Sequence, residues 1–139
     1  MEYLKKETIE EALSLSYRQY LTGHLQRPQP FLRHIEDDTE IGISYYKEYM
    51  ADVPHVHTIA AEHAFVLSGS VRCRLLDGSG MELQFDAGDF FTFRPGEAHA
   101  TKNAPGTKVL FIKVPGVNDK TPVEVDMDTH RWLESWERD

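Results

Sequence analysis

The chain has 139 residues, which is enough for one domain with a hydrophobic core and too few for two domains of ordinary size. Its 15 Lys and Arg residues stand against 23 Asp and Glu residues, and a net charge of −8 without any basic cluster argues against a nucleic-acid-binding protein. No run of about 18 apolar residues is present, and the first residues lack the apolar stretch of a secretory signal. We therefore expect a cytoplasmic protein that neither enters nor binds a membrane.

The first 30 residues are expected to form a helical arm followed by a linker. Thr8 and Glu11 have the spacing of a capping box, apolar residues recur at helical intervals after them, and Gly23 is suited to end the helix. Two prolines between residues 25 and 30 break the helical pattern and lead into extended chain. We predict one helix from Thr8 to Gly23.

Residues 31–116 have the sequence pattern of an all-β domain. Short runs rich in β-branched and aromatic residues alternate with turn residues, and the DGSG stretch at residues 77–80 marks the clearest hairpin. This pattern is typical of an antiparallel sandwich or barrel, here with about nine or ten strands.

Residues 117–139 are more polar and are expected to form a C-terminal tail with a short helix. Asp126 or Asp128 is suited to cap that helix. Trp132 and Trp136 are four residues apart, so they would share one helical face. We interpret the pair as packing against the barrel or against a second subunit.

A group of metal-ligand residues lies in the stretch PHVHTIAAEH, residues 54–63. On a strand, residues two apart point to the same side, so His55 and His57 present both imidazoles to one face. Glu62 follows after two alanines, at a spacing that allows the chain to turn and return its carboxylate. Two imidazoles and a carboxylate suit a first-row divalent metal, although the same histidine pair also occurs on exposed strands without one.

A second motif lies in the stretch GDFFTFRPGEAHATKN, residues 88–103. It contains a Gly-Asp turn, a short β-type run, a Pro-Gly turn, His99 and Asn103. Taken together, the two stretches resemble the two conserved motifs of the cupin superfamily. That resemblance spans roughly residues 31–116, and the joint spacing of both motifs is far more specific than either half.

The resemblance implies a fold and a cofactor. The fold is an antiparallel double-stranded β-helix, also called a jelly roll or cupin barrel, with the two motifs on facing strands. Three histidines and one glutamate would bind one divalent transition metal ion, Fe, Mn, Ni, Zn, Co or Cu, and the implied ligands are His55, His57, Glu62 and His99. The sequence departs from the family pattern at Tyr49, where a glycine is usual, and at Arg94, where a proline is usual.

Other site candidates are weaker. Tyr45 and Tyr49 precede the metal strand, and either would be a hydrogen-bond donor or proton-transfer group if it pointed inward. Arg94 follows the FFTF run and is suited to a two-pronged contact with a carboxylate or phosphate. Glu82 is a further candidate base, whereas His63 is expected to face away from the barrel interior, because Glu62 faces inward.

Two functions remain open from the sequence. In the first, the protein is an enzyme that acts on a small oxygen-rich molecule, either as a dioxygenase or as a non-redox isomerase, lyase or decarboxylase. In the second, it is a metal-anchored module that binds or senses a sugar or metabolite without turnover. Both functions occur among cupin folds, so the fold does not decide between them. We expect a homodimer, in which a second copy covers exposed strand edges.

Overall fold

A computed structural model describes all 139 residues of the chain as eleven strands and two helices. The strands are β1 (Arg18–Thr22), β2 (Glu40–Tyr46), β3 (Met50–Ala51), β4 (His55–His57), β5 (Ala61–Ser68), β6 (Ser70–Leu75), β7 (Glu82–Asp86), β8 (Phe90–Phe93), β9 (His99–Asn103), β10 (Thr107–Val114) and β11 (Lys120–Pro122). The helices are α1 (Lys6–Leu15) and α2 (Met127–Trp132). The all-β class with an N-terminal helix and a short C-terminal helix is confirmed.

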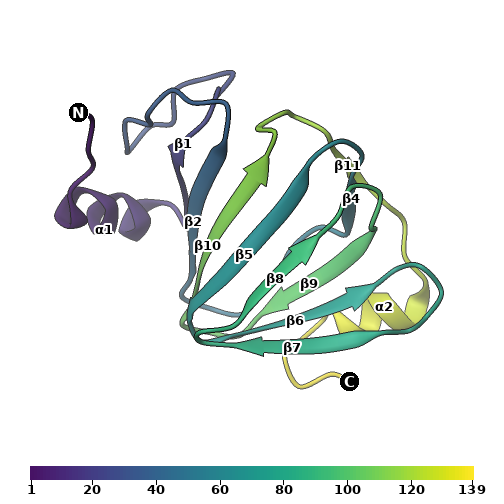
Figure 1. Cartoon of the computed structure of the whole chain (residues 1–139). Helices are drawn as coiled ribbons and strands as arrows, with labels where there is room; N and C mark the ends of the chain where they lie inside the picture. Colours follow the sequence, from purple (N-terminus) through teal and green to yellow (C-terminus); the bar gives the residue numbers. More distant parts are fainter.

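The strands form two antiparallel sheets that face each other (Figure 1). One sheet has the order β1-β2-β10-β5-β8, and the other has the order β11-β4-β9-β6-β7 with β3 paired to β9. The hairpin expected at residues 77–80 joins β6 to β7, with Cys73 opposite Leu83. The sandwich extends beyond residues 31–116, because β1 pairs with β2 and β11 pairs with β4.

The prediction of one helix from Thr8 to Gly23 is wrong in its second half. Helix α1 ends at Leu15, and β1 begins at Arg18. In β1, Gln19 is 1% exposed and donates a hydrogen bond to the carbonyl of Ala12, so the strand packs directly against the helix. The backbone of β1 gains a ladder of hydrogen bonds with β2, and this tertiary pairing outweighs a helical pattern that is itself weak.

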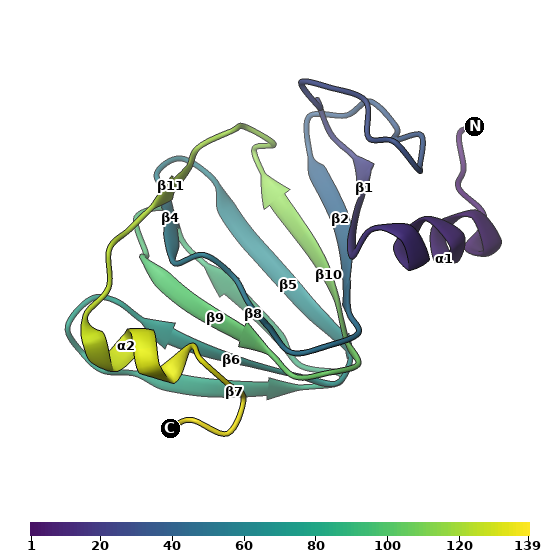
Figure 2. The same ribbon diagram turned by 180° about the vertical axis from the view of Figure 1, so that it is seen from behind.

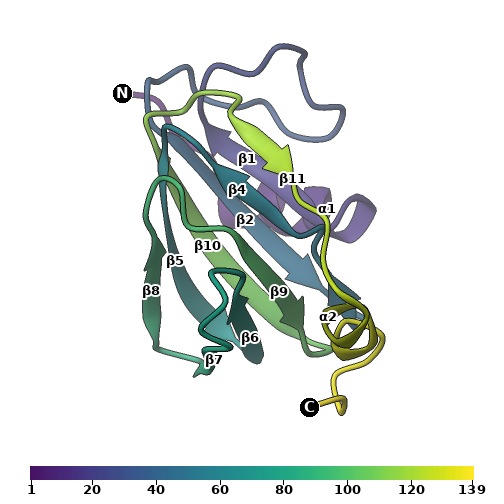
Figure 3. The same ribbon diagram turned by 90° about the vertical axis from the view of Figure 1, so that its right-hand side faces the viewer.

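The two helices pack on different sheets (Figure 2). Helix α1 lies beside β1 and β2, whereas α2 lies against the outer side of β6 and β9, as Figure 3 shows from the side. The Nζ atom of Lys102 on β9 donates to the carbonyls of Trp132 and Ser135, which satisfies the end of α2. Asp126 caps the start of α2, as predicted, whereas Trp136 lies beyond its last residue. Neither helix has the length and apolarity needed to cross a membrane.

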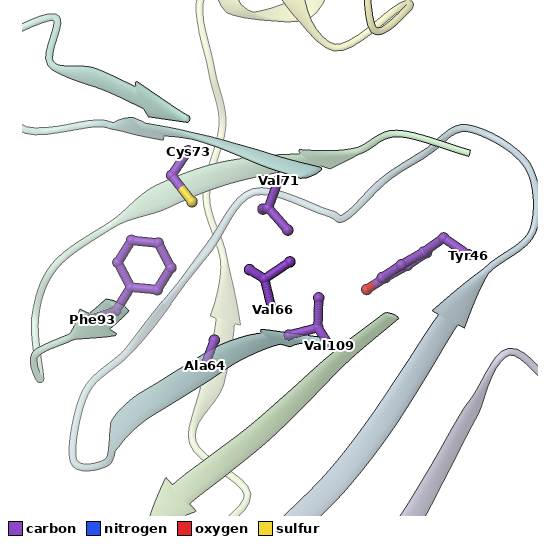
Figure 4. Close-up of a cluster of buried hydrophobic side chains, with 7 residues drawn as sticks. All are labelled: Tyr46, Ala64, Val66, Val71, Cys73, Phe93 and Val109. Carbon is purple, nitrogen blue, oxygen red and sulfur yellow. The ribbon is translucent and has the colours of Figure 1, made fainter. Parts of the chain in front are cut away.

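The apolar core lies between the sheets and is small. Its seven residues (Figure 4) are Tyr46, Ala64, Val66, Val71, Cys73, Phe93 and Val109. Along β5 the side chains alternate as the sequence predicts, with Val66 fully buried and Phe65 38% exposed. Beside this core, polar side chains and a few aromatic rings of the two inner faces line a cavity.

Candidate metal centre

The three histidines of the two motifs come together on neighbouring strands of one sheet. His55 and His57 both point inward from β4, and His55 lies directly opposite His99 in the pairing of β4 with β9. The ring centroids are 4.9 Å apart for His55 and His57 and 4.5 Å apart for His55 and His99. All three side chains are buried, because the opposite sheet covers them.

Glu62 approaches the histidines from the other sheet. It lies on β5, and one of its carboxylate oxygens is 3.1 Å from Nε2 of His57. The ligand atoms of His55, Glu62 and His99 all lie within 4.8 Å of one another. The four residues implied by the resemblance therefore meet at one place, and we call His55, His57, Glu62 and His99 the candidate metal centre.

Hydrogen bonds to Nδ1 orient each imidazole. Nδ1 of His55 donates to the carbonyl of Val53 at 2.7 Å, and Nδ1 of His99 donates to the carbonyl of Glu97 at 2.9 Å. Because a carbonyl oxygen only accepts, Nδ1 carries the hydrogen and Nε2 carries the lone pair in both rings. The ring of Phe93 also stacks on His99 at a centroid distance of 3.5 Å. Both imidazoles are thus held with a free nitrogen lone pair.

The Asp119 carboxylate orients the imidazole of His57. One oxygen of its buried carboxylate accepts from Nδ1 of His57 at 2.9 Å, and the other accepts from the backbone N–H groups of Ile59 and Ala60 at 2.8 and 2.7 Å. Burial acts to raise the pKa of Asp119, but these donors outweigh it and lower the pKa to about 2. Such carboxylate partners of histidine ligands fix ring orientation and increase ligand basicity.

The charge state of the candidate metal centre favours a cation. Burial lowers the pKa of His55 to about 4 and also lowers the pKa of His99, so both rings are neutral at neutral pH. Burial acts against ionisation of Glu62 as well, but the nearby imidazole of His57 outweighs it and lowers the pKa of the carboxyl to about 2. The pKa of His57 is raised, because Glu62 and Asp119 together outweigh the effect of burial.

The residues fit a divalent metal ion. Nε2 of His57 is buried, and although Glu62 lies close to it, the two groups are not aligned as a hydrogen bond. A buried nitrogen without such a partner is costly unless another group uses its lone pair. Imidazole nitrogen and carboxylate oxygen are the donor types that first-row divalent metals bind in proteins. The donor set therefore has both the unsatisfied nitrogen and the chemistry that a metal ion requires.

The candidate metal centre opens into a cavity of about 380 Å³. This volume lies at the lower end of the range for pockets that bind small molecules. Phe91, Phe93 and Phe111 supply apolar wall, while Thr101 and Asn103 continue the polar face of β9 beyond His99. A small molecule in this cavity would lie directly against the candidate metal centre.

The weaker site candidates do not line the cavity. Tyr45 lies on the outer face of β2 under the ammonium of Lys108. The hydroxyl of Tyr49 donates to the carbonyl of Leu133 at 2.5 Å and so holds the C-terminal segment. Arg94 is exposed at the end of β8. The structure thus brings the four metal-ligand candidates together but places these three side chains elsewhere.

Two further predictions concern residues outside the candidate metal centre. His63 faces outward and contacts the Thr92 hydroxyl at 2.8 Å, as the alternation along β5 predicts. Glu82 forms an ion pair with Arg74 at 3.3 Å on the second sheet and does not line the cavity. The sequence reasoning missed Asp119, whose 62-residue separation from His57 leaves no local motif.

Comparisons with known proteins agree with this architecture. Residues 47–114 match the cupin domain family, whereas none of the curated proteins matches the chain. An uncharacterized conserved protein with a double-stranded beta-helix domain from Klebsiella pneumoniae subsp. pneumoniae is similar, with 18% identity and a TM-score of 0.60, over 90% of this chain and 100% of that chain. KdgF from Halomonas sp. is similar with 17% identity and a TM-score of 0.55, over 73% of this chain and 80% of that chain.

A variant of oxalate decarboxylase from Bacillus subtilis is also similar, with 22% identity and a TM-score of 0.53 over 62% of this chain. The match covers only 24% of that enzyme, so the present chain corresponds to a fraction of its length. At these identities the likeness concerns the fold alone. The family match, the two opposed antiparallel sheets and the positions of both motifs agree, and residues 47–114 are a cupin domain.

Proposed function

We propose that the protein is a metal-dependent enzyme that acts on a small oxygen-rich molecule. One observation carries the proposal: three oriented imidazoles and one carboxylate converge on the wall of a cavity, and Nε2 of His57 has no hydrogen-bond partner there. His55, His57, Glu62 and His99 would hold one divalent transition metal ion. Such an ion supplies Lewis acidity for an isomerase, lyase or decarboxylase reaction and, if redox-active, a site for dioxygen.

The chain itself adds a proton-transfer group beside this centre. Lys113 lies next to Glu62 in the pairing of β10 with β5, and both side chains point inward. Its Nζ atom is 3.2 Å from a carboxylate oxygen of Glu40, and the lysine side chain is 9% exposed. Because Lys113 lines the cavity, it is our candidate for exchanging a proton with a bound substrate.

One structural relative bears on the metal and the reaction class. The oxalate decarboxylase of Bacillus subtilis has Mn(II) centres, and its fold resembles this chain at 23% identity with a TM-score of 0.53. This similarity supports Mn(II) as one candidate metal and decarboxylation as one candidate reaction.

A metal-anchored binding module is the second candidate function. Two pairs of charged groups in the cavity lining neutralise each other, Arg18 with Asp52 and Lys113 with Glu40. The third carboxylate of the lining, Glu62, lies 3.1 Å from Nε2 of His57 and belongs to the candidate metal centre. A site without a free base is suited to binding without turnover.

Metal content tests the proposal. Elemental mass spectrometry on untagged protein should find about one equivalent of a transition metal, retained after dialysis. His99→Ala should lose it, because the remaining donors leave one position unfilled, whereas His63→Ala should keep it, because His63 points away from the cavity. Equal metal content in the two variants would overturn the proposed centre.

Turnover separates the two functions. Small oxo acids, hydroxy acids and diketones are incubated with metal-loaded protein, with and without dioxygen, and products are followed by NMR. Consumption by the wild type and not by His57→Ala supports the enzyme. Saturable binding of a compound that is recovered unchanged would instead support the binding module.

A further inference from the structure

The far end of the cavity contains a second polar cluster, which we call the Arg18 network. It is built from β1, β2, β9 and the loop after β3, and its members are Arg18, Ser44, Tyr46, Asp52, Thr101 and Asn103. All six residues line the same cavity as the candidate metal centre. The hydroxyl of Tyr46 points into the barrel (Figure 4). Only Thr101 and Asn103 of this cluster lie in the two sequence motifs.

Most polar atoms of the Arg18 network satisfy one another. Nε of Arg18 donates to the hydroxyl of Ser44 at 2.9 Å, and Nη2 donates to the hydroxyl of Tyr46 at 3.0 Å and to Asp52 at 3.4 Å. The Asp52 carboxylate also accepts from Thr101 at 2.9 Å and from Asn103 at 3.2 Å. Asp52 is therefore saturated with donors, and the guanidinium is held in one orientation.

One nitrogen of Arg18 has no acceptor. None of the hydrogen bonds that Arg18 makes involves Nη1, whose N–H groups are the remaining donors of the guanidinium, although the side chain of Tyr20 also lies close to it. The rings of Tyr17 and Phe111 flank the guanidinium, with centroids 5.2 and 5.4 Å from Cζ. Phe111 occupies this place because Gly42 leaves room, since a Cβ there would overlap the phenyl ring. A rigid, half-dehydrated donor with no partner is suited to an anion.

The charge of the cavity favours the same ligand. Its lining contains four Lys or Arg residues and three Asp or Glu residues, which gives a net charge of +1 with neutral histidines, in a protein whose total charge is −8. Arg27 and Lys120 stand at this lining without an ion-pair partner. A divalent ion at the candidate metal centre would raise the local charge to about +3.

We infer that Arg18 anchors the carboxylate of a substrate whose oxygen donors lie at the candidate metal centre, so the substrate class is small oxo or hydroxy acids with a second carboxylate. This inference rests on the proposed function and names its substrate class. Thr101 lies two residues from His99 on the same face of β9, about 7 Å along the strand, and Asp52 links Thr101 to Arg18. The candidate metal centre and Arg18 are thus on the order of 10 Å apart. A five- or six-carbon molecule that contacts both would span this distance.

A matched pair of ligands tests the anchor. 2-Oxoadipate and 2-oxohexanoate have the same chain length and the same metal-binding end, but only 2-oxoadipate has a distal carboxylate. Binding of both to metal-loaded protein is measured by titration calorimetry, and the metal content of every sample is determined first. We expect the wild type to bind 2-oxoadipate at least about tenfold more tightly, because a charged hydrogen bond in a half-buried site contributes that much.

Three variants assign the preference to Arg18. R18Q should bind both ligands equally, and R18K should lose about threefold of the preference, because its single ammonium does not replace the planar guanidinium. K108Q removes an outward-facing lysine of β10 and should behave like the wild type. R18K also serves if R18Q does not fold, which near-UV circular dichroism shows.

The outcomes separate this inference from the proposed function. Equal binding of the two ligands to the metal-loaded wild type, no binding of either, or an undiminished preference in R18Q or R18K overturns the role of Arg18 and leaves the metal centre standing. Absence of metal from the wild type would overturn the proposed function itself.

Discussion

The two ends of the cavity differ in which of their polar groups have hydrogen-bond partners. At the candidate metal centre, Nδ1 of each imidazole donates a hydrogen bond, and Nε2 of His55 and His99 keeps a free lone pair. In the Arg18 network the carboxylate of Asp52 is saturated, and the donors left over belong to Nη1 of Arg18. One end therefore lacks a cation and the other lacks an anion. A single molecule could occupy both ends, with its oxygen donors on a metal ion at the candidate metal centre and its carboxylate at Nη1 of Arg18.

The two ends also differ in how the chain builds them. His55 and His99 are oriented by carbonyls only two residues away, so short segments of chain determine their geometry. Arg18 is oriented by Ser44, Tyr46 and Asp52, which lie 26 to 34 residues away and reach it only because β1 joins the sheet. The orientation of His55 and His99 should therefore depend on local geometry, and that of Arg18 on the closure of the sandwich.

Metal binding should have the largest effect on the stability of the fold. At a free metal concentration of 100 times the Kd, the free energy of unfolding should rise by about 2.7 kcal/mol, which corresponds to a shift in Tm of about 10 °C. Differential scanning calorimetry with and without Mn(II) or Zn(II) measures the shift. His57→Ala should remove it, and an equal shift in that variant would show that the metal binds elsewhere.

Removal of Asp119 should lower metal affinity without affecting the Arg18 network. In Asp119→Ala the ring of His57 loses its orienting carboxylate, and metal affinity should fall by about 10- to 100-fold. Asp128→Asn is the matched control, because Asp128 is exposed and pairs with Arg74 outside the cavity. Competition with a chromophoric chelator measures both affinities. Unchanged affinity in Asp119→Ala would show that packing alone orients His57.

Loss of the hydrogen bond between Thr101 and Asp52 should destabilise the Arg18 network and leave metal affinity unchanged. Thr101→Val preserves the shape of the side chain but removes the donor to Asp52, so the free energy of unfolding should fall by about 1 kcal/mol. Metal affinity should not change, because the valine lies two residues from His99 and makes no contact with its Nδ1 partner. A tenfold loss of metal affinity in this variant would show that the two ends are coupled.

Cys73 belongs to the apolar core and reports on how readily that core opens. Burial raises the pKa of its thiol, so the thiol stays protonated at pH 9, where an exposed cysteine would be at least half ionised. Iodoacetamide at pH 9 should therefore leave the native protein unmodified and modify it fully in urea, as mass spectrometry shows. Rapid alkylation of the native protein would indicate that the core opens readily.

The sequence predicts the metal end far better than the Arg18 end, for a physical reason. His55, His57 and Glu62 occur within eight residues, and strand alternation alone indicates which of them share a face. Asp119 and Arg18 act through partners 62 and 34 residues away, so their roles depend on which strands become neighbours. The same dependence on strand pairing explains why residues 18–22 are predicted to be helical but form a strand. The expected homodimer stays a prediction.

Anomalous diffraction from crystals grown with Zn(II) or Mn(II) tests the central claim most directly. We predict one strong peak inside the cavity, within about 2.0 to 2.2 Å of the donor atoms of the candidate metal centre in the zinc-loaded protein. The chain offers an exposed alternative, in which His24 contacts Glu36 and Asp38, each at 2.7 Å. A peak at that surface cluster, with none between His55, His57, Glu62 and His99, would contradict the proposed metal centre.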